Sequence, residues 1–295
     1  GIEWHEKTLG QLFCDGSARQ IVAMLMDECP ADAVKLSLSK AITSVSHSDG
    51  RYRVEYGGET AFAPSLVVAT GGPSIPKMGA TGFAYDLARQ FGLKIVEPRP
   101  ALVPLTLGGE ETLFRSLSGV SAPVIARCGK TAFREAALFT HKGLSGPAIL
   151  QISSYWQHGE PVEIDFLPDL RAEWLTEAKQ QLPRLSLKKA VNAHLPARLT
   201  ETLIERIALD GELGNLTNKK LDEAARRLSH WRFMPNGTEG FAKAEVTAGG
   251  ISTAELSSKN MEARQVPGFY AIGTNMTSRL RFRPPCWNRK RMAVI

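Results

Sequence analysis

A chain of 295 residues with 43% hydrophobic side chains can bury a sizeable core and is long enough for two folded regions. Its apolar runs are all shorter than the roughly 18 to 20 residues of a membrane-spanning helix, so no membrane partner is expected. Four cysteines without C-x-x-C spacing make neither a disulfide framework nor a zinc site, and we therefore expect a protein of the reducing cytoplasm.

The formal charge of +6 is unevenly distributed along the chain. Residues 263–295 contain seven basic and no acidic side chains, which leaves 29 basic and 30 acidic ones in residues 1–262. A basic surface often indicates nucleic acid, because it neutralises phosphates. Since the excess is confined to the end of the chain, we interpret it as an unstructured basic tail, with nucleic acid as an alternative partner.

Short segments of alternating polarity follow a first helix. That helix is expected at residues 17–28, with Ser17 as its N-cap. Short strands are predicted at residues 34–38, 42–45, 51–56 and 59–62. Turn-forming residues at 47–50 and 57–58 separate the last three strands, so His47 is placed in a turn. The pattern predicts a small antiparallel meander that leads into a buried parallel strand.

The stretch LVVATGG at residues 66–72 is the most informative in the chain. Its apolar first half predicts a buried strand, and side-chain bulk is lost where that strand would reach the carboxyl edge of a sheet. Glycine lets the backbone turn sharply and approach a flat or phosphorylated ligand, and open α/β sheets bind ligands at this edge. A nucleotide cofactor is therefore expected near Thr70, although a glycine pair also serves simply to make a turn.

The remainder of the chain divides into a β-rich part and a helical part. After a helix at residues 82–91 and a strand at 94–96, Pro98 and Pro100 indicate a boundary. Residues up to 166 are mostly strand, with a hairpin around residues 128–130 and a helix at 145–156. Apolar residues recur at helical spacing in residues 173–175, 190–195, 198–209 and 219–228.

Four longer motifs carry a family resemblance. They are WHEKTLGQLF at residues 4–13, VVATGGPSIPKMGATG at 67–82, FTHKGLSGPAIL at 139–150 and AEVTAGG at 244–250. Taken in order, they resemble the BaiN/RdsA family of NAD(P)/FAD-dependent oxidoreductases, and the similarity extends from Trp4 to about Gly273. The resemblance implies an FAD-binding domain of the glutathione-reductase type that receives an inserted substrate domain.

The expected fold class is α/β, and α+β overall, with four consecutive parts. The parts are an incomplete FAD-binding domain at residues 1–96, an inserted substrate domain at 97–243 (mostly β over 97–166, helical over 167–235), a return to the FAD-binding domain at 244–273, and an atypical basic tail at 274–295. The first domain is expected to be incomplete because no G-x-G-x-x-G occurs in the chain, and the family's glycine fingerprint would precede Gly1. The tail departs from the family pattern after Gly273.

The resemblance also implies where cofactor and chemistry lie. Cofactor contacts are expected from Ile42, Ala69, Thr70, Gly71, Gly72, Thr247, Gly249, Gly250 and Gly273. His141 is the candidate catalytic residue, because a histidine before a glycine-bracketed helix start can donate a proton or polarise a carbonyl. A structural histidine is the alternative, and Ser145 is expected to cap the helix. The histidines show no metal-ligand spacing, so no metal site is predicted.

The implied function is FAD-dependent reduction of an activated C=C bond with hydride from NAD(P)H. The substrate is either a small molecule, such as a bile-acid-like enone, or an RNA base. One alternative is therefore a flavoenzyme that reduces uridine of ribosomal RNA to dihydrouridine. Another is a non-catalytic fragment of a flavoprotein, and the oligomeric state is left open.

Overall fold

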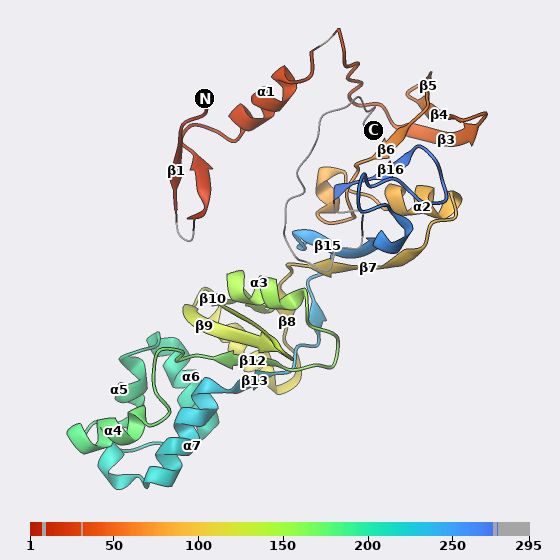
Figure 1. Cartoon of the computed structure of the whole chain (residues 1–295). Helices are drawn as coiled ribbons and strands as arrows, with labels where there is room; N and C mark the ends of the chain where they lie inside the picture. The colour runs from red at the N-terminus through yellow and green to blue at the C-terminus, as the bar shows by residue number, and fades with distance from the viewer. Residues whose placement is uncertain (8–9, 31, 274–275, 277–295) are drawn as a thin grey trace. The chain divides into compact units, whose positions relative to one another are not determined.

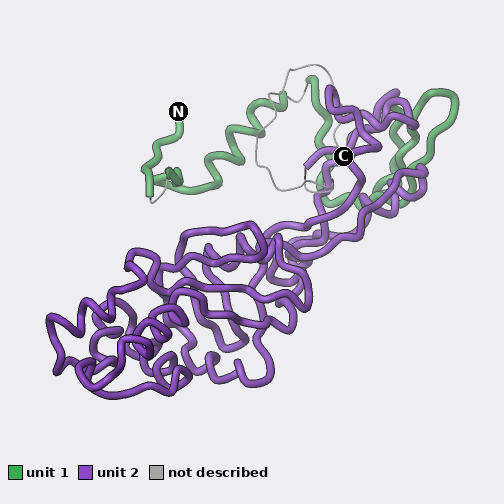
Figure 2. The backbone as a smooth tube through the Cα atoms, turned by 60° about the horizontal axis from the view of Figure 1, so that its bottom comes forward, with its two compact units in different colours: residues 1–63 green, residues 64–295 purple. Residues whose placement is uncertain are grey.

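The computed structural model describes residues 1–7, 10–30, 32–273 and 276 (Figure 1). Two compact units make up the chain, residues 1–63 and residues 64–295, which Figure 2 colours separately. The predicted basic tail at residues 274–295 lies outside the described residues except for Met276.

The first unit contains a hairpin, a helix and a meander. Its elements are β1 (Trp4–Glu6), β2 (Leu12–Cys14), α1 (Arg19–Asp27), β3 (Ile42–Ser48), β4 (Arg51–Tyr56) and β5 (Glu59–Ala63). Strands β1 and β2 pair antiparallel, and β3, β4 and β5 form a three-stranded antiparallel sheet in chain order. The predicted meander is therefore confirmed.

Three local predictions for the first unit are wrong. His47 lies in β3 opposite Tyr52, because the turn is confined to Asp49 and Gly50, which both adopt positive φ. Residues 34–38 form no strand, since extended backbone becomes a strand only by pairing and no described segment pairs with it. Helix α1 begins later than predicted and has Ala18 at its N-cap, with no side-chain cap.

A parallel strand pair and a short antiparallel sheet open the second unit. Strand β6 (Leu66–Val68) is fully buried and pairs in parallel with β16 (Phe269–Ala271), which confirms the predicted buried parallel strand. Helix α2 (Phe83–Gln90) contacts β7 (Ile95–Ala101) and β15 (Val246–Ile251), and these two strands pair antiparallel.

Pro98 and Pro100 do not end a structural element, contrary to the prediction. Both lie inside β7, which has β15 as its one partner in a two-stranded sheet. An edge strand tolerates proline, because one side of its backbone has no pairing to lose.

A seven-stranded sheet forms the centre of the second unit. Its strands are β8 (Leu105–Thr106), β9 (Ser121–Cys128), β10 (Thr131–Phe139), β11 (Gly143–Ser145), β12 (Val162–Asp165), β13 (Trp231–Phe233) and β14 (Gly237–Thr238). They are ordered β13-β12-β9-β10-β11-β8-β14, and every neighbouring pair is antiparallel. The β9–β10 hairpin confirms the turn predicted near Cys128. Helix α3 (Pro147–Ser153) packs on β9 and β10.

Helices follow this sheet at the predicted positions. They are α4 (Trp174–Gln181), α5 (Leu187–Asn192), α6 (Ala197–Ile207) and α7 (Asn218–Ser229). The short 3-10 helices of the unit are η2 (Pro76–Met78), η3 (Gly109–Leu117), η4 (Leu213–Asn215) and η5 (Thr253–Glu255). The stretch expected to be helical up to residue 235 nevertheless ends in β13, because Trp231 and Phe233 bury their rings in the sheet core.

The seven-stranded sheet and the helices share one hydrophobic core. Ring contacts at its centre join Phe114, Phe139, Phe166, Trp231 and Phe233. The overall class is thus mixed α/β. Within the described part of the chain, no helix combines the length and the apolar character that crossing a bilayer requires.

Candidate functional site

Strands β6 and β16 bring distant parts of the sequence to one sheet edge. Val68 lies opposite Ala271, and the Ile272 amide donates a hydrogen bond to the Val68 carbonyl at 3.0 Å. Because the strands are parallel, the segments that follow them leave at the same carboxyl edge. Three predicted cofactor residues, Ala69, Thr70 and Gly273, are exposed there.

Backbone at this edge is open to a ligand. Gly273 has a φ of +81°, and a Cβ atom built on it would meet no heavy atom within 4 Å. Gly71 also adopts positive φ, at 72°. The edge therefore offers unobstructed main chain of the kind that a flat ring system or a phosphate can approach.

Gly72 faces the protein interior instead. It is buried, and a Cβ atom on it would lie 2.6 Å from Thr247 Oγ1 and 2.7 Å from the Tyr85 hydroxyl oxygen. The Thr247 hydroxyl also forms a hydrogen bond of 2.9 Å with the Ser74 hydroxyl. The structure thus brings the Thr70–Gly72 turn together with Thr247, which the resemblance had assigned to the same site.

Tyr85 and Ser74 are additional residues of this site, and the sequence analysis did not select them. Ser74 lies inside the motif at residues 67–82, two positions after the glycine pair. Tyr85 is a phenol on the buried face of α2, beside Ala84, Leu87 and Ala88. A polar group on the apolar face of an amphipathic helix is the signal that would have indicated it.

The glycine pair at residues 249–250 has a packing role. Gly249 has a φ of +90°, and a Cβ atom on it would overlap the Glu97 carbonyl of β7. The register of β15 against β7 shifts at this point, between Ala248 and Gly250, as in a β-bulge. Both glycines lie in the strand pair rather than at the open edge, so close backbone approach explains at least Gly249.

Ile42 belongs to the first unit and is described there. It is half-buried at the start of β3 and lies opposite Tyr56 of β4. Its expected contact with a cofactor stays a prediction.

His141 lies in a tight turn between β10 and β11. The Thr140 hydroxyl accepts hydrogen bonds from the Lys142 and Gly143 amides at 3.2 and 3.1 Å and so closes the turn. The His141 side chain is exposed, and no hydrogen bond or ion pair joins it to any described residue. A Cβ atom on Gly143 would overlap the Leu105 carbonyl, so glycine is required where β11 meets β8.

Ser145 does not cap the following helix, contrary to the prediction. It is the last residue of β11, and Gly146 occupies the N-cap position of α3. Gly146 has a φ of +87°, and a Cβ atom there would lie 2.8 Å from the Ala136 carbonyl oxygen. The chain therefore turns from strand to helix at a glycine, because the neighbouring strand β10 is too close for a side chain.

One short segment connects the His141 turn with the loop after Gly72. Lys142 Nζ forms an ion pair of 2.9 Å with Glu239, and the Ile75 amide donates to the Phe241 carbonyl at 2.9 Å. Two residues of chain span at most about 7 Å. The turn that carries His141 and the loop that follows Thr70–Gly72 are thus anchored close to each other.

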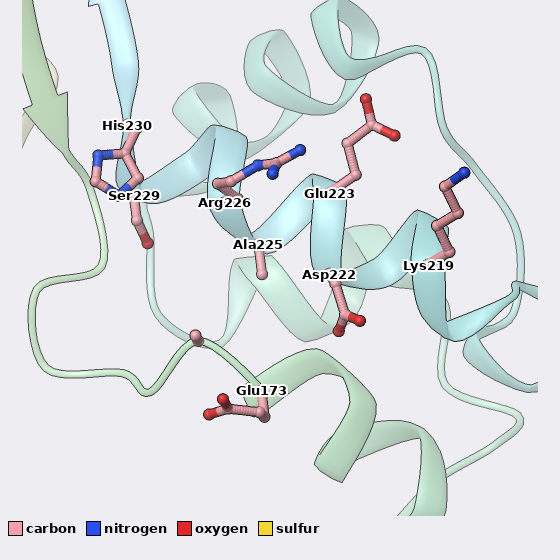
Figure 3. A pocket seen from close by; sticks show the side chains of 9 residues that line it. Glu173, Lys219, Asp222, Glu223, Ala225, Arg226, Ser229 and His230 are labelled. Atoms are coloured by element: carbon pink, nitrogen blue, oxygen red, sulfur yellow. The ribbon is translucent and has the colours of Figure 1, made fainter.

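An open depression of about 710 Å³ lies elsewhere, among the helices (Figure 3). Its lining residues are Ala172, Glu173, Lys219, Asp222, Glu223, Ala225, Arg226, Ser229 and His230. Figure 3 shows side chains of both charges spread along α7. Such a pattern is typical of a solvated helix face, and none of the predicted cofactor residues lines the depression. The described residues contain no cluster of metal-ligating side chains.

Comparisons with known proteins agree with the family that the motifs predict. The family model described as HI0933-like protein barrel and H2TH domain matches residues 99–246. Ribosomal RNA dihydrouridine synthase of Escherichia coli (strain K12) is 48% identical over 286 residues, which cover 94% of this chain and 70% of that protein. The protein of the same name from Haemophilus influenzae (strain ATCC 51907 / DSM 11121 / KW20 / Rd) is 44% identical, with coverage of 92% and 70%.

A third relative is more distant. The 3-dehydro-bile acid delta(4,6)-reductase of Clostridium scindens (strain ATCC 35704 / DSM 5676 / VPI 13733 / 19) is 25% identical over 273 residues, which cover 87% of this chain and 66% of that protein. The family model and the two nearer relatives together establish the assignment. The chain belongs to the HI0933-like family of flavin-dependent oxidoreductases.

Proposed function

We propose that this protein reduces uridine in ribosomal RNA to dihydrouridine, with FAD as cofactor and NAD(P)H as the source of hydride. The observation that carries the proposal is the similarity to two ribosomal RNA dihydrouridine synthases over more than nine tenths of this chain. The open sheet edge at Ala69, Thr70 and Gly273 supports it, because the edge suits a planar cofactor.

The residues present fit a flavin. Exposed main chain at Ala69, Thr70 and Gly273 would lie against the ring system, and the amides of Gly71 and its neighbours are free of side-chain obstruction. Bound FAD would supply transfer of a hydride from NAD(P)H to the C6 atom of the uracil ring. The protein has to orient the base and deliver a proton.

His141 is the proposed proton donor. Reduction of the C5=C6 bond adds a hydride at C6, which is conjugated with the C4 carbonyl, and a proton at C5. An exposed imidazole on a turn closed by Thr140 can hold that proton close to a bound base. The ion pair between Lys142 and Glu239 keeps the turn near the loop that follows Gly72.

The test uses protein produced from its own gene and ribosomal RNA that lacks dihydrouridine. We expect flavin absorbance in the purified protein and, with NAD(P)H, a gain of two hydrogens in one uridine by mass spectrometry. His141→Asn should lower kcat by about 10²- to 10⁴-fold with unchanged flavin content. His158→Asn, a second exposed histidine, is the matched control and should retain activity. Colourless protein, or RNA that gains no hydrogen, would contradict the proposal.

A small conjugated enone is the second candidate substrate. The similarity to a bile-acid reductase favours it, and a steroid enone shares the C=C–C=O unit of uracil. Oxidation of NAD(P)H with a 3-oxo steroid, but not with ribosomal RNA, would replace the first proposal by this one. Activity on RNA alone would support the first.

A further inference from the structure

Tyr85 carries a buried hydroxyl group that has no hydrogen-bond partner among the described residues. The residue is only 3% exposed, and its oxygen atom is shielded from solvent. Buried polar atoms are hydrogen-bonded in the great majority of cases, and an exception requires an explanation. A buried tyrosine in particular usually places its hydroxyl group against an acceptor.

The surroundings of this hydroxyl are the predicted cofactor turn. The Tyr85 oxygen lies 2.7 Å from the position of a Cβ atom on Gly72, and Thr247 Oγ1 lies 2.6 Å from the same position. The Thr247 hydroxyl is engaged with Ser74 at 2.9 Å. Three hydroxyl groups from three separate segments therefore surround a residue without a side chain.

Tyr85 is suited to act as a donor. Burial raises the pKa of Tyr85, and the nearby Thr247 hydroxyl partly offsets this rise although the two groups do not reach hydrogen-bond geometry. The phenol therefore keeps its proton throughout the physiological range. An unused donor in a protein interior is satisfied by water or by a ligand acceptor.

The loop that covers this hydroxyl is strained. Ile75 adopts φ 55° and ψ 64°, a left-handed conformation that β-branched residues rarely enter. The hydrogen bond from its amide to the Phe241 carbonyl keeps it there. Strain of this kind persists only where the surrounding structure enforces it, and it can be relieved when a ligand binds.

We propose that the Tyr85 hydroxyl is a ligand contact, which donates its hydrogen bond to an acceptor oxygen of the molecule bound at the Thr70–Gly72 turn. The acceptor is a carbonyl or phosphate oxygen of the cofactor or a carbonyl oxygen of the substrate base. This inference rests on the proposed function, because that function brings such molecules to the turn.

The deciding variant is Tyr85→Phe, which removes one oxygen atom and preserves the ring. In the absence of ligand its melting temperature should be no lower than that of the wild type, since no hydrogen bond is lost. If the acceptor belongs to FAD, the variant should bind FAD about tenfold more weakly. If the acceptor belongs to the substrate, FAD affinity should be unchanged and KM for the substrate should rise about tenfold.

Two results would overturn the inference. One is a lower melting temperature of the ligand-free variant, which would reveal a partner inside the protein. The other is wild-type FAD affinity together with wild-type KM. Tyr155→Phe, at an exposed tyrosine of the same unit, is the control and should change neither quantity. Wild-type protein that takes up neither FAD nor substrate would end the proposed function and this inference together, whereas a Tyr85→Phe variant equal to an active wild type would end only the inference.

Discussion

Thr247 occupies the space into which a side chain at Gly72 would project. A Cβ atom on Gly72 would lie 2.6 Å from Thr247 Oγ1 and 2.7 Å from Thr247 Cβ. Non-bonded carbon atoms separate by about 3.5 to 4.0 Å at contact, so the two residues fit only because one is glycine. The two motifs that end in glycine pairs therefore pack against each other, and Gly72 has a structural reason for its identity besides any ligand.

Substitution of Gly72 by alanine should destabilise the protein. The new methyl group has to displace Thr247 and Tyr85, which are both buried, and overpacking of this kind costs about 1 to 3 kcal/mol. Urea denaturation of Gly72→Ala should therefore show a lower midpoint with an unchanged slope.

Gly82→Ala is the matched control in the same loop. Gly82 has a φ of −82°, and the nearest heavy atom to its Cβ position is Tyr85 Cδ2 at 4.0 Å. It is the N-cap of α2, where alanine in place of glycine costs less than about 1 kcal/mol. Equal losses in the two variants would mean that the contact with Thr247 does not determine the effect.

Local sequence patterns were sufficient for the strands and helices of this protein. Alternating polarity and turn residues located β4, β5 and the β9–β10 hairpin, because both signals come from residues adjacent in the chain. Apolar spacing located α4 to α7 for the same reason. The errors lie where one turn residue too many was counted, at His47, or where a helix cap was assigned by residue type, at Ser145.

The candidate site was only partly predictable. The exposed edge at Thr70 and Gly273 followed from strands that end in small residues, which is a local signal. The contact of Gly72 with Tyr85 joins different elements of the fold, and no pattern within either segment contains it. Gly249 and Gly143 are glycines because a neighbouring strand passes close by, which also depends on tertiary structure.

Lys142→Ala should cost more stability than removal of an ordinary surface ion pair. Its partner Glu239 has a side chain only 9% exposed, so the variant leaves a carboxylate that is poorly hydrated. We expect a loss of about 1 to 2 kcal/mol. The double variant Lys142→Ala/Glu239→Gln should recover much of that loss, because it removes the unpaired charge.

Lys188→Ala is the comparison for this ion pair. Lys188 and Glu201 form a pair of 2.7 Å in which both side chains are about half exposed. Exposed pairs contribute between 0 and about 1 kcal/mol. The reasoning about Glu239 would be wrong if chemical denaturation gave the two lysine variants the same free energy of unfolding.

Glu111→Gln should stabilise the protein at neutral pH. Burial raises the pKa of Glu111, while the Met234 amide and the Arg206 charge oppose the rise. A carboxyl group with a raised pKa in the folded state binds its proton more tightly there, so stability falls as pH rises from the unfolded pKa of about 4.3 through the folded pKa. The glutamine variant avoids this loss and can still accept the hydrogen bond from Met234.

The gain from Glu111→Gln should shrink as the pH is lowered. Below about pH 4 both forms of the protein carry an uncharged group at this position, so their melting temperatures should converge. Glu110→Gln changes an exposed neighbour, which is paired with Arg206, and should have little effect at either pH. A glutamine variant of Glu111 that melts below the wild type at pH 7 would show that its charge is stabilised in the folded protein.

Cys128 should resist alkylation until the second unit unfolds. Burial, together with the neighbouring Glu160 carboxylate, raises the pKa of the Cys128 thiol to about 11. Only about one molecule in a thousand then carries the reactive thiolate at pH 8, and the sulfur is also buried at the end of β9. Cys29 is exposed and should react first with iodoacetamide, as peptide mapping by mass spectrometry would show. Glu160→Gln removes the charge but not the burial, so Cys128 in that variant should stay protected in the folded protein. Labelling of Cys128 at the rate of Cys29 would contradict this account, because a thiol in the core shared by sheet and helices becomes accessible only when that core opens.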